Sequence, residues 1–238
     1  MASRLIVISP PGMIPKEAAT LNRLFASGLQ CYHARKPECS LETVRQLLAA
    51  VDPQYHPHIR LHQHHQLAQD FDVGGIHYPT KVLPPLPLQP YVVDSHRGSQ
   101  SPSMAGSEGD ALDSNFGAMS STSRRTLVQS TSLHSLEDLQ GGKARYGALD
   151  YAFLSPIFDS ISKKGYAAAK FDPVQLRTLL QEHGKQLPVI ALGGISAENC
   201  LQALDMGFQG VAVLGSIWEA QDPVAEMERF MQQLQKHA

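Results

Sequence analysis

The stretch 189–217, VIALGGISAENCLQALDMGFQGVAVLGSI, passes from an apolar strand to a helix twice in succession. Val189–Leu192 and Val211–Leu214 are short apolar runs, which are typical of strands buried on both faces. Gly193-Gly194 follows the first run and Gly215 follows the second, and the residues between the two runs have helical periodicity. This repeated strand–glycine–helix unit predicts a parallel β/α architecture.

The same alternation extends over most of the chain. We expect further strands at 5–8, 29–34, 59–61, 75–77, 127–129 and 151–154, and helices at 15–27, 41–48, 66–71, 136–140, 173–183, 197–206 and 223–235. A doubly wound sheet usually has five or six strands and an early glycine-rich phosphate loop, and neither is seen. Eight strands therefore predict the α/β class and a single domain over 1–238, a (β/α)8 TIM barrel.

One segment interrupts the alternation. Residues from about 96 to 125 are rich in Ser and Gly, and they follow PPLPLQP at 84–90. Such a composition buries too little apolar surface to offset the entropy lost on ordering. We expect a flexible insertion after the fourth strand. A domain boundary is the alternative, and it is disfavoured because the β–α alternation resumes without a new start.

The composition limits the classes of function. The chain has 238 residues, a formal net charge of −2 and a pI near 6.6, which argues against nucleic-acid binding. Three cysteines without a pairing pattern fit a reducing compartment. The apolar run near the amino terminus is too short for a secretory signal, and no segment approaches the roughly 20 apolar residues of a membrane span. We expect a cytoplasmic protein; a homo-oligomer stays open.

The glycines after the last two strands are the first candidate site. The chemistry of such barrels lies at the carboxyl ends of the strands, and a phosphate site often follows strands seven and eight. Glycine lets backbone N–H groups approach an anion, and a helix amino terminus adds favourable partial charge. Tight turns alone would also explain the glycines of Gly193-Gly194 and Gly215-Ser216. Two such loops on consecutive strands favour phosphate.

A Ser/Lys loop after the strand at 151–154 is the second candidate. Ser160, Ser162 and Lys163 offer hydroxyl donors and an ammonium group, which suit phosphate or pyrophosphate. A loop of this composition is usually only solvated. Its position at the carboxyl end of a strand favours the binding role.

Three further polar residues are candidates by position. His134 follows a strand and is suited to proton transfer near neutral pH. It is equally explained as a bystander of a helix capped by Ser135. His33 and Arg35 lie two residues apart at the end of the second strand, so their side chains are expected on the same face. That face is either the barrel axis, where Arg35 would contact an anion, or the surface.

A run of five histidines is the most conspicuous cluster in the sequence, but it gives the weakest prediction of a site. His56, His58, His62, His64 and His65 crowd one region but lack an organised metal-ligand spacing. We interpret them as polar histidines of a loop and a strand end and predict no metal site. Only His62 is expected at the barrel mouth.

Four motifs together carry a family resemblance: LHSLEDL, DYAFLSPIFDSISKKGY, VIALGGISAENC and GFQGVAVLGSI. The chain resembles the thiamine phosphate synthase/TenI family over about 4–80 and 127–236. The resemblance implies a TIM barrel that binds a thiazole phosphate ester. In the synthase it implies a pyrimidine diphosphate as well.

Departures from the synthase pattern indicate a branch. The synthase carries Gln-x-Arg-x-Lys on strand two, where this chain has His33, Arg35 and Pro37. It also carries acids after strands three and four that help to hold Mg²⁺. Here His62 and Gln63 stand after strand three, and no carboxylate follows strand four. Without these acids Mg²⁺ has poor ligands, because hard cations prefer carboxylate oxygens.

What remains is similar to the TenI-type thiazole tautomerases. This resemblance implies a metal-free proton transfer on a thiazole carboxylate phosphate, with His134 as the acid and base. Gly194, Leu214 and Gly215 would cradle the phosphate, and Lys163 would be its charge partner.

Two alternatives stay open. One is a divergent synthase, which joins hydroxymethylpyrimidine diphosphate to thiazole phosphate with Mg²⁺ and releases pyrophosphate. The presence of Ser132, Ser162 and Lys163 supports it. The other is a non-catalytic sensor of thiazole or thiamine phosphates.

Overall fold

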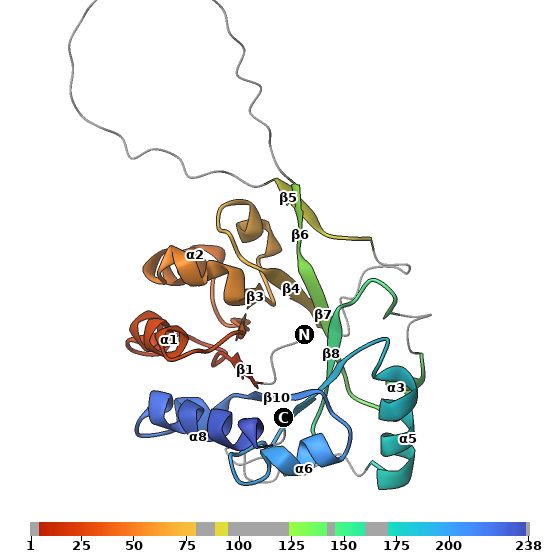
Figure 1. The fold of residues 1–238 in the computed structure, drawn as a ribbon. Coiled ribbons are helices and arrows are strands. Elements are labelled where there is room, and N and C mark those ends of the chain that lie inside the picture. Colours follow the sequence, from red (N-terminus) through yellow and green to blue (C-terminus); the bar gives the residue numbers. More distant parts are fainter. Residues whose placement is uncertain (1–4, 80–88, 95–123, 142–145, 160–170, 237–238) are drawn as a thin grey trace, which may run out of the picture.

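Eight parallel strands close into a barrel in the computed structural model, which describes residues 5–79, 89–94, 124–141, 146–159 and 171–236 (Figure 1). Around the barrel the order is β1-β10-β9-β8-β7-β4-β3-β2. The predicted TIM barrel is thereby confirmed. The strands are β1 (Leu5–Ile8), β2 (Tyr32–Ala34), β3 (Ile59–Leu61), β4 (Gly75–Tyr78), β7 (Val128–Leu133), β8 (Tyr151–Leu154), β9 (Val189–Leu192) and β10 (Gly210–Val213).

Helices surround the barrel on its outer side (Figure 1). They are α1 (Glu17–Ala26), α2 (Leu41–Ala50), α3 (Leu136–Gln140), α5 (Pro173–His183), α6 (Cys200–Asp205), α7 (Gly215–Trp218) and α8 (Pro223–Gln235), with 3-10 turns η1 (Pro53–His58) and η2 (His65–Gln69). Side-chain caps fix several starts: Ser40 accepts from the Thr43 amide, and Asp172 accepts from that of Gln175.

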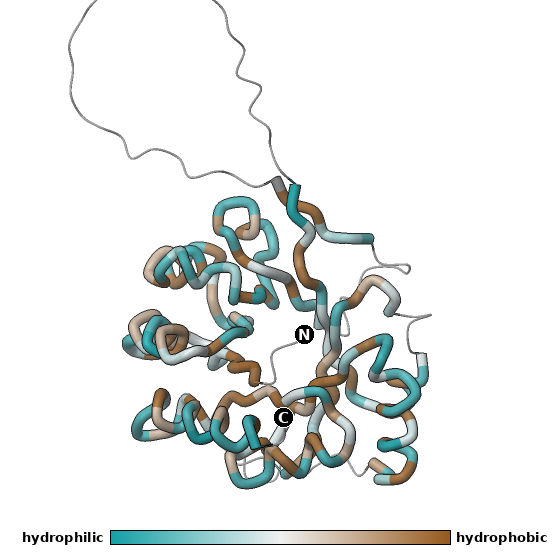
Figure 2. The backbone as a smooth tube through the Cα atoms, viewed as in Figure 1, coloured by the Kyte–Doolittle hydropathy of each residue, from teal (hydrophilic) through white to brown (hydrophobic). Residues whose placement is uncertain are grey.

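The core has two layers because the barrel strands are buried on both faces. Outward residues such as Leu5 and Val7 pack under the helices, while Ile6 and Ile8 point into the barrel. The inner layer contains Ile6, Ile8, Cys31, Tyr151, Phe153, Ile190 and Ala212. Figure 2 shows the corresponding hydrophobic strands in the middle of the molecule. This double burial explains why the strand segments of the sequence read as continuous apolar runs.

A small antiparallel ribbon, β5 (Val92–Asp94) with β6 (Arg124–Thr126), lies between β4 and β7 along the chain. The insertion predicted at 96–125 is therefore too long at its carboxyl end, since Arg124 and Arg125 form a strand. The Arg125 guanidinium anchors this strand, with its Nε 3.0 Å from Asp72 and an N–H donated to the Phe71 carbonyl. Residues 96–123 of the predicted insertion lie outside the described residues.

Two predicted boundaries were also too generous. The strand expected from residue 29 begins at Tyr32, because the Leu29 amide still bonds to Leu24 at the end of α1. The helix expected from residue 197 begins at Cys200, after a turn.

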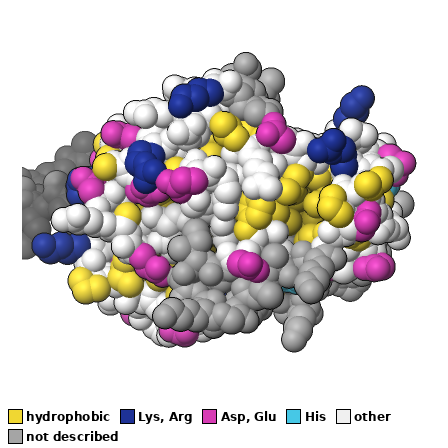
Figure 3. All heavy atoms as spheres, turned by 90° about the horizontal axis from the view of Figure 1, so that it is seen from below, with side chains coloured by type: hydrophobic (Ala, Val, Ile, Leu, Met, Phe, Trp, Pro, Cys, Tyr) yellow, Lys and Arg dark blue, Asp and Glu magenta, His cyan; other side chains and the backbone are white. Residues whose placement is uncertain are grey.

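The surface carries no single dominant sign of charge on the face seen in Figure 3, where acidic and basic side chains are interspersed. This agrees with the formal net charge of −2. Among the described residues, no helix combines the length and apolar character needed to cross a membrane.

Candidate functional site

A pocket of about 570 Å³ lies where the barrel strands end. Its size falls within the range of small-molecule sites. Every barrel strand, or the loop directly after it, contributes to the wall. The lining residues are Ile8, Arg35, Pro37, His62, Gln63, His77, Pro79, Ser132, His134, Phe153, Ser155, Pro156, Phe158, Leu192, Gly193, Gly194 and Leu214.

The structure brings most of the predicted site residues to this pocket. Those that line it are Arg35, His62, Ser132, His134, Gly193, Gly194 and Leu214. Gly215 directly follows Leu214 and begins α7. His33 is fully buried beneath the pocket and does not line it. Ser160, Ser162 and Lys163 lie outside the described residues.

The glycine turn after β9 is fixed by geometry that other residues adopt poorly. Gly193 has φ +99° and Gly194 has φ +63°. A Cβ on Gly194 would also lie 2.2 Å from the backbone oxygen of Asp159. The turn therefore requires glycine at these two positions. The same turn lines the pocket with its backbone.

Side chains hold this turn against the next loop. The Asn199 amide donates to the Gly194 carbonyl at 2.8 Å and accepts from the Ser196 amide at 2.8 Å. The Ser216 hydroxyl donates to the Ile195 carbonyl, which ties the loop after β10 to the loop after β9. The two loops predicted to act together are therefore in contact. The sequence analysis missed Asn199. Its position five residues after Gly194, close to the start of the next helix, is the signal that could have identified it.

His134 stands at the pocket edge with an exposed side chain. Its Nδ1 lies 3.3 Å from the Ser155 carbonyl oxygen. The Ser135 hydroxyl accepts from the Asp138 amide, as expected of the cap of α3. Both readings of this motif are therefore compatible, because the neighbouring serine caps the helix while the histidine faces the pocket.

A cluster of three histidines forms the floor of the site. The His33 Nδ1 and the His62 Nε2 are 2.9 Å apart, and the rings of His62 and His77 stack at 4.0 Å between centroids. The other ring nitrogen of His33 lies 2.5 Å from the Tyr151 hydroxyl. The cluster therefore joins β2, β4 and β8 to the loop after β3.

His77 is held between two hydroxyl groups. Its Nδ1 is 2.9 Å from the Ser130 hydroxyl and its Nε2 is 3.0 Å from that of Ser132, both on β7. The sequence analysis missed His77, because one histidine in a short apolar strand carries no distinguishing pattern. Only the inward register of β4 identifies it.

Burial controls the charge of this cluster. Desolvation, followed by neighbouring positive groups, lowers the pKa of His33 and of His62 well below the usual value. The same causes lower the pKa of His77 to about 3. All three imidazoles are therefore neutral at pH 7.

Three of the other crowded histidines bond to nearby backbone carbonyls. His56 bonds to the Leu48 carbonyl, His58 to that of Gln30 and His64 to that of Cys39. These contacts fit the interpretation of polar histidines on a loop. Only His62 of the run lines the pocket.

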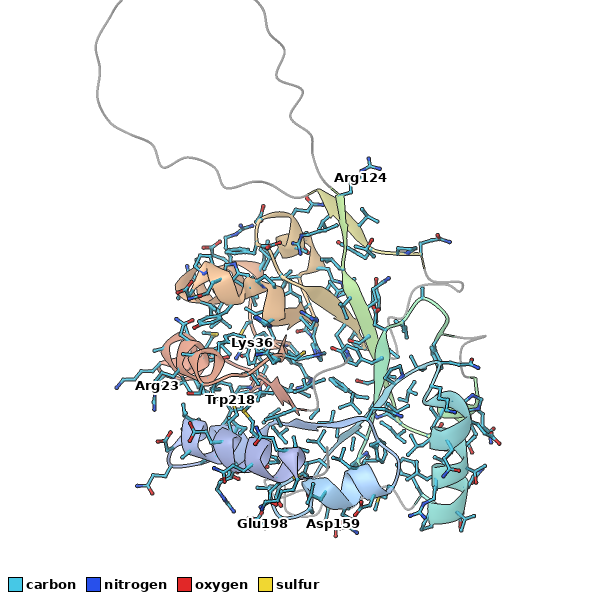
Figure 4. The ribbon with its side chains drawn as sticks, in the orientation of Figure 1. Arg23, Lys36, Arg124, Asp159, Glu198 and Trp218 are labelled. Carbon is cyan, nitrogen blue, oxygen red and sulfur yellow. The ribbon has the colours of Figure 1, made fainter. Side chains whose placement is uncertain are left out.

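Two adjacent cations point to different places. Arg35 is exposed and lines the pocket. Lys36 is buried, and its ammonium group lies 2.7 Å from the Glu17 carboxylate and donates to the Gly12 carbonyl. The Tyr32 hydroxyl donates to the same carboxylate at 2.8 Å. Lys36 is thus part of the scaffold, inside the molecule in Figure 4.

The donor set of the pocket does not fit Mg²⁺. The described lining offers imidazole nitrogens, hydroxyl oxygens and the Gln63 amide, but no carboxylate. Mg²⁺ is held mainly by carboxylate and water oxygens.

Comparison with known proteins finds similar sequences and structures. A family model described as thiamine monophosphate synthase matches residues 120–217, which include His134 and both glycine loops. A curated thiamine-phosphate synthase and a solved thiamine phosphate pyrophosphorylase also match. These matches support the resemblance to the thiamine phosphate synthase/TenI family.

The curated relatives are thiamine-phosphate synthases. That of Bacillus licheniformis is 32% identical over 111 residues, which is 45% of this chain and 46% of the relative. That of Listeria monocytogenes serotype 4b is 35% identical over 94 residues, or 38% of this chain and 41% of the relative. The chain spans about half the length of the curated relatives it matches.

Solved structures match over nearly the whole chain. Thiamine phosphate pyrophosphorylase from Bacteroides thetaiotaomicron is 27% identical, with a TM-score of 0.65 over 98% of this chain and 96% of that one. The enzyme of the same name from Pyrococcus furiosus is 15% identical, with a TM-score of 0.67 over the same shares, and shows the fold alone.

Proposed function

We propose that the pocket binds a thiazole phosphate ester and that the protein joins this ester to a pyrimidine diphosphate with release of pyrophosphate. The observation that carries the proposal is the pair of contacting glycine loops that face the pocket after β9 and β10. The names of the relatives support the synthase, which was the alternative in the sequence analysis, over the tautomerase.

Backbone groups would hold the phosphate in this proposal. The N–H groups of the Gly193-Gly194 turn and of the Leu214–Gly215 turn are the donors, because glycine allows an anion to approach closely. Arg35 supplies a positive charge on the opposite wall, where it would contact the diphosphate. Ser160, Ser162 and Lys163 stay predicted contributors to the same anion site.

The leaving pyrophosphate needs neutralising charge. In synthase chemistry Mg²⁺ supplies it, but the described lining does not offer the ligands that this ion prefers. Within the described residues the group best placed for the role is the Arg35 guanidinium, which has no acidic partner there.

A tautomerase is the second candidate, favoured by the position of His134. An imidazole at the pocket edge can take a proton from a bound thiazole and return it elsewhere on the ring. The Ser155 carbonyl beside Nδ1 would fix the ring orientation. This reaction needs no pyrimidine and no diphosphate.

A binding test addresses the phosphate site first. Thermal unfolding of the full chain is measured with a hydroxyethylthiazole phosphate and with the unphosphorylated alcohol. We expect stabilisation by the ester only. Equal effects of both compounds would contradict the phosphate site.

Comparing two ligands tests the phosphate site more directly than replacing Gly194 does. A side chain at Gly194 would collide with backbone atoms, so that variant could lose binding simply by disturbing the fold. The matched protein variants are Arg35→Met in the pocket and Arg23→Met on α1, whose side chain points away from the molecule (Figure 4). Only Arg35→Met should weaken binding of the diphosphate.

A turnover test then separates the candidates. Formation of thiamine phosphate from both substrates supports the synthase. Conversion of a thiazole carboxylate phosphate to its aromatic tautomer, without coupling, supports the tautomerase. Ester binding with neither reaction would contradict both and identify a sensor.

A further inference from the structure

We propose that His33, His62 and His77 form a binding site for a divalent transition-metal ion of the Zn²⁺ class, at the floor of the pocket. One ring nitrogen from each residue lies within 4.8 Å of the other two, and all three side chains are buried. No other group of this kind occurs among the described residues. The inference goes beyond the proposed function and does not depend on it.

The ligand chemistry favours a transition metal over Mg²⁺. Imidazole nitrogen suits Zn²⁺, Ni²⁺ and Cu²⁺, whereas Mg²⁺ requires oxygen ligands. A histidine must be neutral to bind a metal.

The spacing of the nitrogens is close to what a metal needs. Zn–N bonds of about 2.0–2.1 Å in a tetrahedron place the nitrogens roughly 3.3 Å apart. The His33 and His62 nitrogens are 2.9 Å apart, and the third nitrogen lies within 4.8 Å of both. Side-chain shifts of at most roughly 1.5 Å would complete the site.

The second nitrogen of two rings is already anchored. The His33 Nε2 faces the Tyr151 hydroxyl at 2.5 Å. His77 has a hydroxyl partner on each ring nitrogen, Ser130 on Nδ1 at 2.9 Å and Ser132 on Nε2 at 3.0 Å, so a bound ion would replace one of these two contacts. Histidine ligands of metals usually make such a bond with the nitrogen that does not bind the ion. These contacts hold the rings on β2 and β4 toward a common centre.

The open side of the cluster faces the pocket. His62 and His77 line the pocket, and His33 lies beneath them. Three protein ligands with a free position toward substrate are the arrangement of catalytic zinc sites. Because the ligands are neutral and Arg35 is nearby, the fourth ligand should be an anion, either hydroxide or a phosphate oxygen.

The competing account is a metal-free chain of hydrogen-bonded histidines. In that case one of the His33 and His62 nitrogens donates to the other, and the cluster only fills the barrel. The two accounts predict opposite results for metal titration of the intact protein.

The experiment uses the full chain freed of metal by EDTA and then dialysed. Zn²⁺ is titrated by calorimetry, with Mg²⁺ as the control ion, and Co²⁺ is titrated by visible absorption. We expect one equivalent of Zn²⁺ to bind, Mg²⁺ not to compete, and Co²⁺ to give the intense bands of a tetrahedral nitrogen site. A Co²⁺ spectrum unchanged from that in buffer would overturn the proposal.

Variants then locate the ion. His62→Gln and His77→Gln should each weaken Zn²⁺ binding by at least about 100-fold, since loss of outer-shell partners alone typically costs 10–100-fold. His64→Asn is the matched control, because His64 bonds to a backbone carbonyl and Asn tolerates its φ of 56°. Circular dichroism of each metal-free variant checks the fold. Binding retained in both cluster variants, or lost equally in His64→Asn, would overturn the assignment.

Discussion

The two halves of the barrel build the pocket from different chemistry. The half from β7 to β10 faces the pocket with glycine turns, hydroxyl groups and His134, and the family model at 120–217 covers it. The half from β1 to β4 contributes His62, His77 and Arg35, and it lies outside that match. The half that we propose to bind phosphate thus resembles the family model, while the opposite half carries donors of its own.

The two halves differ in how far backbone groups, rather than side chains, face the pocket. Backbone N–H groups in a rigid turn bind an anion whatever side chains surround them. Imidazoles and a guanidinium act through side chains, so their identity sets which reactions and ions are possible. The family match therefore supports the proposed phosphate site in the β7–β10 half more directly than any function of the β1–β4 half.

The largest effect is expected in the half that the family model covers. If His134 transfers a proton, His134→Asn should lower turnover by about 10²–10⁴-fold, because that is the usual contribution of general acid–base catalysis. Affinity for the thiazole ester should change little, since the glycine loops that we propose as the phosphate site lie on other strands. Steady-state rates and ester binding are measured together.

His183→Asn, at the end of α5, is the matched control and should leave turnover unchanged. Full turnover in His134→Asn would remove His134 from the chemistry and leave the phosphate half with a binding role only.

The next effect concerns the scaffold of the opposite half. Lys36→Met leaves the Glu17 carboxylate buried without its cation, so the free energy of unfolding should fall by about 3–5 kcal/mol. Urea unfolding at pH 7 measures this loss. The double change Lys36→Met with Glu17→Gln should restore most of it, because no buried charge remains.

Arg23→Met breaks an exposed pair with Asp222, at 3.6 Å, and should change the free energy of unfolding by less than about 1 kcal/mol. Similar losses in Lys36→Met and Arg23→Met would show that the buried pair is not a special support of this half.

The pH dependence of stability should also belong to the histidine half. In metal-free protein, the unfolded chain takes up protons below pH 6.5 that the native cluster does not, since the native pKa of His77 is about 3. Each such histidine should lower the free energy of unfolding by about 1.4 kcal/mol per pH unit as the pH falls from 6.5 toward 3.

Urea unfolding at pH 7, 6 and 5 measures this slope after EDTA treatment. His77→Gln should remove roughly one proton from the slope, and His64→Asn should not reduce it by that amount. A slope that does not change in His77→Gln would place the acid sensitivity outside the cluster.

The smallest effect tests the positioning of the glycine turn. Asn199→Ala removes the amide that bonds to Gly194 and Ser196. Ester binding should weaken by roughly tenfold, as expected for a loss of about 1–1.5 kcal/mol of hydrogen bonding. Asn22→Ala, whose amide bonds to the Ala50 carbonyl and the Asp52 N–H away from the pocket, should leave ester affinity unchanged. Equal affinity in both variants would show that the turn keeps its shape without Asn199.

Local sequence patterns were sufficient to predict the barrel and one half of the candidate site. Its β–α alternation is local, because strands, helix caps and glycine turns each depend on a few neighbouring residues. Val189–Leu192, the Ser135 cap and the Gly193-Gly194 turn all appear where the pattern placed them. Since the carboxyl ends of parallel strands meet, the convergence of the two glycine loops with His134 could also be predicted.

The contacts in the β1–β4 half of the pocket could be seen only in the folded structure. His33 meets His62 across 29 positions and Tyr151 across 118, and His77 joins them through the register of β4. The strand at Arg124 likewise exists through pairing with a partner far away in the chain. Such contacts depend on barrel closure and strand register, which short-range patterns do not encode. For the same reason the sequence did not reveal that Arg35 faces the pocket while Lys36 turns inward to Glu17.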